Sequence, residues 1–301
     1  MSDQPMVRED IPSPPNPLGM DGIEFVEYAT HRPQALGQVL EAMGFCPVAR
    51  HRSREVTLYR QGGMNLVVNA SPDDSRVVAA RDSQPVLSAV AFRVQDAQRA
   101  HAHCLDLGAW DVPSHARGME LHIPAIQGPG GSRFYWVDRW RDFSIFDIDF
   151  VPIPGVDTHP PAIAGMDYFG LVQYVGLDRA SDWQAWYGHL LGFTPLPDDE
   201  RFGILPKGRV LRSPCHRFFW QLIEPETWGD AITPSSEYLQ RIGLGTHDVS
   251  GAVQALQARG VRFVEAAGLR QGETGAHGAL TRGELGGVAF ELVRRPEWSV
   301  S

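Results

Sequence analysis

The chain has 301 residues, of which 43% are hydrophobic and 21% charged, and its formal net charge at pH 7 is −9. This is ordinary globular composition, and the length suffices for two domains that each bury a core. The negative charge disfavours nucleic acids and anionic membrane surfaces as partners. The cysteines, Cys46, Cys104 and Cys215, lie far apart and form no CxxC pair. This spacing argues against a disulfide framework and a cysteine zinc site.

The start of the chain is polar and rich in proline. It lacks the apolar stretch of a signal peptide, so we expect residues 1–17 to form a flexible arm. No apolar run reaches the length of a transmembrane helix. These features favour a cytoplasmic protein without membrane contact.

The strongest pattern in the sequence is an internal repeat. In each half, an alternating run predicts a strand, at residues 23–28 and at residues 168–175. A predicted helix follows, the second one at residues 183–191, and each ends at a glycine, Gly44 or Gly192. Glycine is favoured there because helix ends commonly need a left-handed residue.

A second unit follows in each half. Strands are predicted at residues 89–94 and 242–245, and the helices after them are opened by Asp96 and Asp248, which suit the N-cap position. Each half then closes with two more strands; the predicted ranges are 134–137 and 144–150 in the first half, and 279–282 and 288–294 in the second. Each half therefore reads β-α-β-β-β twice.

A proline-rich linker separates the two halves. Residues 151–161 contain four prolines and a glycine, a composition typical of linkers. The predicted domains are residues 18–157 and residues 158–301.

Three segments of the first half carry a family resemblance. They are ARHRSREVTLYRQGGMNLVVNA at 49–70, MELHIPAIQG at 119–128 and SIFDIDF at 144–150. They resemble the N-terminal domain of bacterial 4-hydroxyphenylpyruvate dioxygenases, which belong to the vicinal oxygen chelate superfamily. The resemblance implies an α+β fold of two tandem vicinal oxygen chelate modules, each made of paired βαβββ units that form an open curved sheet. It also places the pocket in the C-terminal module.

The resemblance further implies a metal site. In that family the C-terminal module holds one Fe(II) with two histidines and one glutamate, which leaves positions open for a 2-oxo acid and O₂. Carried over, the glutamate is Glu291, the first histidine position is Gly170 (or Tyr168, with a two-residue insertion), and the second is Arg241. Glycine has no ligand atom, protonated tyrosine is a poor ligand, and arginine has no lone pair. Only Glu291 remains as a metal ligand, so no cofactor is expected.

The retained glutamate needs a partner, because a lone buried carboxylate is costly. At the family's positions, the guanidinium of Arg241 would lie where the iron lies in relatives, and it would form a bidentate pair with Glu291. A further active-site histidine position falls on Gln173, or on Leu171 with the insertion. We therefore predict that Arg241, Gln173 and Glu291 bind the ligand.

Other chemical motifs have simpler interpretations. No pair of histidines has the spacing of a metal site, so we interpret them as surface, capping or packing residues. Residues 128–131 (GPGG) lack the following helix of a phosphate loop and read as a hairpin turn. We predict that the cluster of Trp183, Trp186, Tyr187 and Trp220 belongs to the core.

Three functions remain open from the sequence. The first is a relative of 4-hydroxyphenylpyruvate dioxygenase that has lost the Fe(II) site and binds a small organic acid or aromatic ligand. The second is an active dioxygenase of tyrosine catabolism, with Fe(II) held by relocated ligands. The third is a non-catalytic partner of a true dioxygenase. The resemblance also implies a homo-oligomer.

Overall fold

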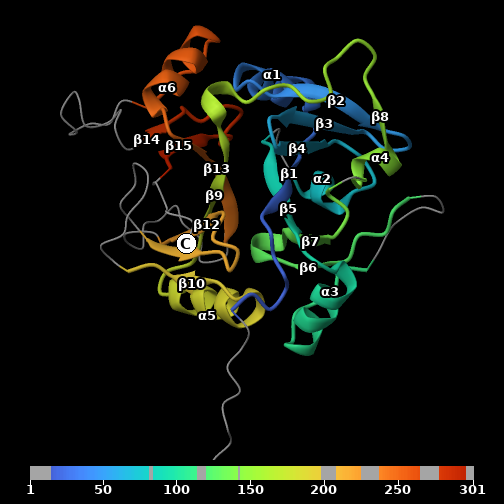
Figure 1. The fold of residues 1–301 in the computed structure, drawn as a ribbon, viewed down its shortest axis with the longest axis vertical. Helices are drawn as coiled ribbons and strands as arrows, with labels where there is room; N and C mark the ends of the chain where they lie inside the picture. Colours follow the sequence, from blue (N-terminus) through green and yellow to red (C-terminus); the bar gives the residue numbers. More distant parts are fainter. Residues whose placement is uncertain are drawn as a thin grey trace, which may run out of the picture.

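The fold has two modules, each built on one mixed β-sheet, with strands of the two sheets side by side in the middle of the molecule (Figure 1). A computed structural model describes residues 15–80, 84–113, 120–141, 143–197, 208–224, 237–264 and 278–295. Helices α1 and α6 lie at one end of the view, and α3 and α5 lie at the other. The architecture is α+β, as the sequence predicts.

The first module holds an eight-stranded sheet with the order β6-β7-β5-β1-β4-β3-β2-β8. Its elements are β1 (Ile23–Ala29), α1 (Pro33–Ala42), β2 (Cys46–His51), β3 (Val56–Gln61), β4 (Met64–Asn69), α2 (Ser75–Ala79), β5 (Val86–Arg93), α3 (Ala97–Asp106), β6 (Ala125–Gln127), η2 (Pro129–Gly131), β7 (Arg133–Val137), α4 (Phe146–Asp149) and β8 (Phe150–Pro152). In this sheet β1 runs parallel to β4 and antiparallel to β5, and β5 runs parallel to β7.

The second module repeats this arrangement in a seven-stranded sheet with the order β10-β11-β12-β9-β13-β15-β14. Its elements are η3 (Ile163–Gly165), β9 (Asp167–Tyr174), α5 (Ala180–Leu191), β10 (Thr194–Pro195), β11 (Arg209–Arg212), β12 (Phe219–Ile223), β13 (Tyr238–Thr246), α6 (Val249–Ala258), β14 (Gly278–Leu280) and β15 (Phe290–Arg294). Here β9 is parallel to β12 and antiparallel to β13, and β13 is parallel to β15. The matching pairings confirm the duplication.

The predicted helix boundaries agree with local capping. The side chains of Asp96 and Asp248 accept hydrogen bonds from the backbone N–H groups of Arg99 and Gly251 at the first turns of α3 and α6. Gly192 ends α5 with φ 75°, a conformation that glycine adopts without strain. Helix α5 begins at Ala180, three residues before the predicted start. The turn at residues 128–131 joins β6 to the antiparallel β7, which confirms the hairpin.

One predicted strand is wrong. Residues 144–150 form mainly the short helix α4, and the extended chain begins only at Phe150. The backbone N–H of Ser144 donates to the Asp147 carboxylate, and the Ser144 hydroxyl accepts from the backbone N–H of Phe146. Such local bonds from serine and aspartate compete with a strand. The turn also buries Phe146 against the sheet.

A single core joins the modules. Phe92 of β5 stacks on Phe218 with ring centroids 5.8 Å apart, and Phe134 of β7 meets Trp220 at 5.5 Å. Tyr187 and Trp220 are completely buried, and Trp183 and Trp186 pack against the same core, which confirms the predicted aromatic cluster. We call the sheet surfaces that face this shared core the junction faces, and the opposite surfaces the open faces.

The first described residues reach the shared core, because Leu18 and Met20 are buried in it. The Asn16 side chain bonds the backbone of Met20 in both directions, and residues 1–14 lie outside the described part. No helix in the described ranges is long and apolar enough to cross a membrane.

Candidate functional site

The predicted position of the family's metal site lies where three strands of the second sheet run side by side. Gly170 of β9 pairs with Gly243 of β13, and Gly243 pairs with Glu291 of β15. These residues line a cavity of about 30 Å³ on the open face, whose other walls include Phe169, Phe219 and Val293. That volume suits roughly one water molecule.

Glu291 is bound by an arginine of the neighbouring strand β13. Arg241 donates from Nε to Oε2 of Glu291 at 2.9 Å, and from Nη1 to Oε1 of Gln240 at 2.9 Å. The side chain of Arg241 is 2% exposed and that of Glu291 is 5% exposed. The ion pair is present, but it rests on the single bond from Nε and is not the predicted bidentate pair, because Nη1 bonds Gln240 instead. Nη2 of Arg241 is buried without a hydrogen-bond acceptor among the described residues.

The first histidine position offers no metal ligand in either alignment. A Cβ atom on Gly170 would lie 2.1 Å from the carbonyl oxygen of Phe219, so the backbone of β12 leaves no room for a side chain. Tyr168 points into the first module, where its hydroxyl donates to the carbonyl oxygen of Asn65. Burial raises the pKa of Tyr168 well above its usual range, so the hydroxyl stays protonated.

These residues do not fit the ferrous site that the fold family implies. The family's arrangement needs two histidines and one carboxylate around open coordination positions. Here a cation occupies the second histidine position and bonds the carboxylate. Nowhere in the described ranges do three histidine, cysteine, aspartate or glutamate side chains gather as a metal site.

Gln173 lies apart from Arg241 and Glu291. Its Oε1 accepts hydrogen bonds from the Tyr187 hydroxyl at 2.7 Å and from Trp220 Nε1 at 3.0 Å. Both partners belong to the shared core, so Gln173 faces the junction side of β9. The structure therefore brings together two of the three predicted ligand-binding residues and gives the third a packing role.

The histidines do not build a replacement site in the described residues. His101 contacts Asp111 at 2.9 Å from Nε2, and His51 packs edge-on against Phe150 with ring centroids 5.2 Å apart. His277 lies outside the described part.

The first module contains a larger cavity that the sequence analysis missed. It has about 180 Å³ on the open face of the eight-stranded sheet. Glu27, Arg76, Asp74 and Asn69 lie at its polar end, with Nη2 of Arg76 2.6 Å from Oδ2 of Asp74 and Nη1 2.8 Å from Oε1 of Glu27. The available signal was Glu27, one of two glutamates, with Glu24, in the fully buried strand β1.

Charge pairing fixes the protonation of this polar end. Burial alone would raise the pKa of Asp74, but the hydrogen bonds and the positive charge of Arg76 outweigh it and lower that pKa to about 2. Negative neighbours, mainly Glu27, outweigh burial at Arg76 and raise its pKa. Asp74 and Arg76 therefore remain charged at neutral pH.

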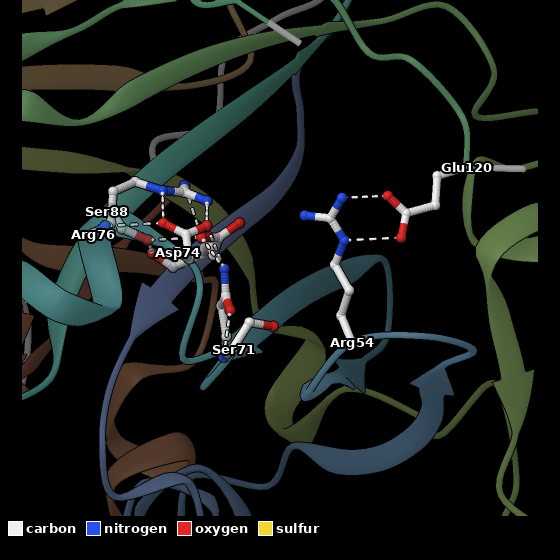
Figure 2. Close-up of polar contacts among 8 residues, drawn as sticks. Arg54, Ser71, Asp74, Arg76, Ser88 and Glu120 are labelled. Atoms are coloured by element: carbon white, nitrogen blue, oxygen red, sulfur yellow. Dashed lines mark hydrogen bonds and ion pairs between the residues drawn. The ribbon is translucent and has the colours of Figure 1, made fainter. Parts of the chain in front are cut away.

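A second ion pair borders the same cavity. Figure 2 shows Arg54 and Glu120 joined by two parallel contacts, separate from the cluster around Arg76 and Asp74. Nε of Arg54 donates to Oε1 of Glu120 at 2.9 Å, and Nη2 donates to Oε2. Arg54 lies in the turn between β2 and β3, whereas Glu120 precedes β6. The pair therefore ties two loops together beside the cavity.

Comparison with known proteins provides independent evidence on the family of this chain. A family model described as hydroxyphenylpyruvate dioxygenase, HPPD, N-terminal, matches residues 15–151. The chain is 34% identical over 262 residues to the 4-hydroxyphenylpyruvate dioxygenase of Pseudomonas aeruginosa, covering 83% of this chain and 72% of that enzyme.

Two further similarities differ in extent. The 4-hydroxyphenylpyruvate dioxygenase of Pseudomonas sp. is 42% identical over 183 residues, a match that covers 60% of this chain and spans only 51% of that relative. Among solved structures, a xylose isomerase-like TIM barrel/4-hydroxyphenylpyruvate dioxygenase fusion protein matches with a TM-score of 0.76 at 24% identity, covering 99% of this chain and 52% of that one. This structural match supports the fold.

Proposed function

The chain belongs to the 4-hydroxyphenylpyruvate dioxygenase family, and we propose that it has exchanged the ferrous site for the Arg241–Glu291 pair and binds a small organic acid or aromatic ligand in its C-terminal module. The bond of 2.9 Å between Arg241 Nε and Glu291 Oε2 carries the proposal. A guanidinium repels a divalent cation and has no lone pair for it. Holding Glu291 in this way removes the one metal ligand that the family pattern retains.

The ligand class follows from the unused donor of Arg241. Its Nη2 is buried and finds no acceptor among the described residues, a situation that costs about 1–3 kcal/mol. A ligand carboxylate would supply the missing acceptor in a charge-assisted bond. The cavity beside Glu291 is about 30 Å³, so an organic acid needs the rings of Phe169 and Phe219 to move aside. Aromatic walls of this kind suit a ligand with an aromatic end.

A binding titration tests the proposal. Calorimetry with 4-hydroxyphenylpyruvate and phenylpyruvate is expected to give saturable binding to the wild-type chain. Arg241→Lys keeps the charge but loses the planar donor array, and we expect roughly tenfold weaker binding, about 1.4 kcal/mol. The double variant Arg241→Met/Glu291→Leu is expected to abolish binding. If the double variant binds these acids with the same affinity as the wild-type chain, the proposal is overturned.

Family membership supports a second candidate, an Fe(II)-dependent dioxygenase whose ligands lie elsewhere. The two candidates differ in one measurement. Oxygen uptake with 4-hydroxyphenylpyruvate after anaerobic addition of Fe(II) is expected to stay at the rate of a protein-free control. Uptake that saturates with the 2-oxo acid would favour the dioxygenase.

A further inference from the structure

The cavity of the first module combines apolar walls with charged side chains, most of which form ion pairs with one another. Phe25, Tyr135, Phe146 and Phe150 line it. Phe25 contacts the Tyr135 ring at 5.9 Å and the Phe146 ring at 6.1 Å, measured between centroids. A cavity of about 180 Å³ compares with cavities of roughly 150 Å³ that bind benzene. The cavity therefore suits a single aromatic ring.

The polar end is held rigidly by hydrogen bonds. Asn69 donates from Nδ2 to Glu27 Oε1 at 3.2 Å and to Asp74 Oδ2 at 3.1 Å, and Ser88 donates to Glu27 Oε1 at 2.9 Å. Figure 2 shows Ser88, Arg76 and Asp74 gathered in one cluster. Glu27, Asn69 and Ser88 come from strands, whereas Asp74 is the N-cap of α2 and Arg76 lies in its first turn. Such a preorganised wall can orient a ligand without paying ordering entropy when it binds.

The charges of the wall disfavour an anionic ligand. Four carboxylates border the cavity, those of Glu27, Asp74, Glu120 and Asp149, and three arginines, Arg54, Arg76 and Arg133. Arg76 is already bound to Glu27 and Asp74, and Arg54 to Glu120. A ligand carboxylate would add negative charge to a lining that already has one more carboxylate than guanidinium, in surroundings where unpaired charge is costly.

A hydroxyl group matches this lining better than a carboxylate does. It donates to a carboxylate and accepts from an arginine or a tyrosine hydroxyl at the same time. Tyr135 is half-buried and lines the cavity. Its phenol group can both donate to and accept from a ligand hydroxyl inside the cavity.

We propose that the N-terminal module binds a neutral, single-ring phenol, with the ring among Phe25, Tyr135 and Phe146 and the hydroxyl at the end formed by Arg76, Asp74 and Glu27. The Arg54–Glu120 pair ties together the two loops beside this site. The site is separate from the C-terminal ligand site, so one proposal can fail while the other holds.

Titration with three probes tests this site. Phenol and catechol are neutral at pH 7 and benzoate is an anion. Ligand-observed NMR measures the binding of each probe. We expect saturable binding of one phenol or one catechol per chain. Benzoate is expected to bind at least about tenfold more weakly, equivalent to 1.4 kcal/mol. Benzoate binding as tight as phenol at this site, or no saturable phenol binding, would overturn the proposal.

Variants place the binding in the first module. Val67→Trp fills the cavity from β4 and is expected to abolish phenol binding. Tyr135→Phe removes one hydroxyl at a half-buried position and is expected to weaken binding roughly fivefold, as for one hydrogen bond. It serves as the test if Val67→Trp fails to fold. The double variant Arg241→Met/Glu291→Leu is the control and is expected to bind phenol like wild type. Loss of phenol binding in this control, or full binding in both cavity variants, would contradict the assignment.

Discussion

Arg241 and Glu291 face each other from neighbouring strands, 2.9 Å apart between Nε and Oε2, with both side chains almost fully buried. A buried charge without a partner is costly, so each of these two groups compensates the charge of the other. This relationship gives the C-terminal site its chemistry, because the carboxylate that would bind a metal is engaged by a cation.

Breaking this pair on one side is expected to destabilise the protein. Glu291→Gln keeps the shape of the side chain but leaves the buried charge of Arg241 uncompensated, and we expect the free energy of unfolding to fall by about 3–5 kcal/mol. Arg241→Met/Glu291→Leu replaces both charges with apolar groups and is expected to be neutral or stabilising. Urea denaturation of both variants checks this. A double variant less stable than Glu291→Gln would contradict it.

The two glycines beside Glu291 are expected to respond in opposite ways to alanine. At Gly170 the new Cβ would lie 2.1 Å from the Phe219 carbonyl oxygen, whereas at Gly243 the nearest atom lies at 3.5 Å. We expect Gly170→Ala to lower the free energy of unfolding by at least about 1–3 kcal/mol. Gly243→Ala, the matched control in the same row, is expected to be neutral or slightly stabilising because it reduces the entropy of the unfolded chain. Equal thermal stability of the two variants would contradict the close packing at Gly170.

The features that could be predicted from the sequence are those that depend on a local pattern of residues. The duplicated strand–helix units, the caps at Asp96 and Asp248, and the family position of Glu291 opposite Arg241 all follow from neighbouring residues or from counting within a motif. The helix at Phe146–Asp149 was missed because side-chain bonds of Ser144 and Asp147 outweigh the apolar alternation of that segment.

The features that could not be predicted depend on which side of a folded sheet each side chain faces. Gln173 lies three residues after Gly170, and an odd separation in a strand places the two side chains on opposite faces. The cavity of the first module joins Glu27 of β1 to Arg76 of α2 and Tyr135 of β7. No short motif links residues so far apart in the chain, so only the assembled sheet reveals the site.

Gln173 is expected to matter for stability. It accepts hydrogen bonds from Tyr187 and Trp220, so Gln173→Leu leaves two buried donors without an acceptor, and we expect a loss of about 2–4 kcal/mol. Adding Tyr187→Phe removes one of the orphaned donors and should recover part of that loss. Chemical denaturation of the single and double variants checks this. A double variant whose loss equals the sum of the two single losses would show that the hydrogen bond is not the cause.

The ion pair of Asp74 predicts a pH dependence. The folded-state pKa of Asp74 is lowered to about 2 from the usual 3.8, so the charged form stabilises the fold above pH 4, and this contribution is lost as the pH falls towards 2. Asp74→Asn keeps the cap of α2 but removes the charge. We expect it to be less stable by about 2 kcal/mol at pH 7, with the difference narrowing below pH 4. Urea denaturation across this range measures it, with Asp106→Asn as a surface control. A difference that stays constant with pH would contradict the assignment.

The iron content of the protein tests the central claim most directly. The purified chain is incubated anaerobically with Fe(II), freed of unbound metal by gel filtration, and analysed by mass spectrometry for bound iron. Because Arg241 holds Glu291 and neither Gly170 nor Tyr168 supplies a ligand, we predict far less than one iron per chain, unchanged in the Glu291→Gln variant. One tightly bound iron per chain that is lost in the Glu291→Gln variant would contradict the account.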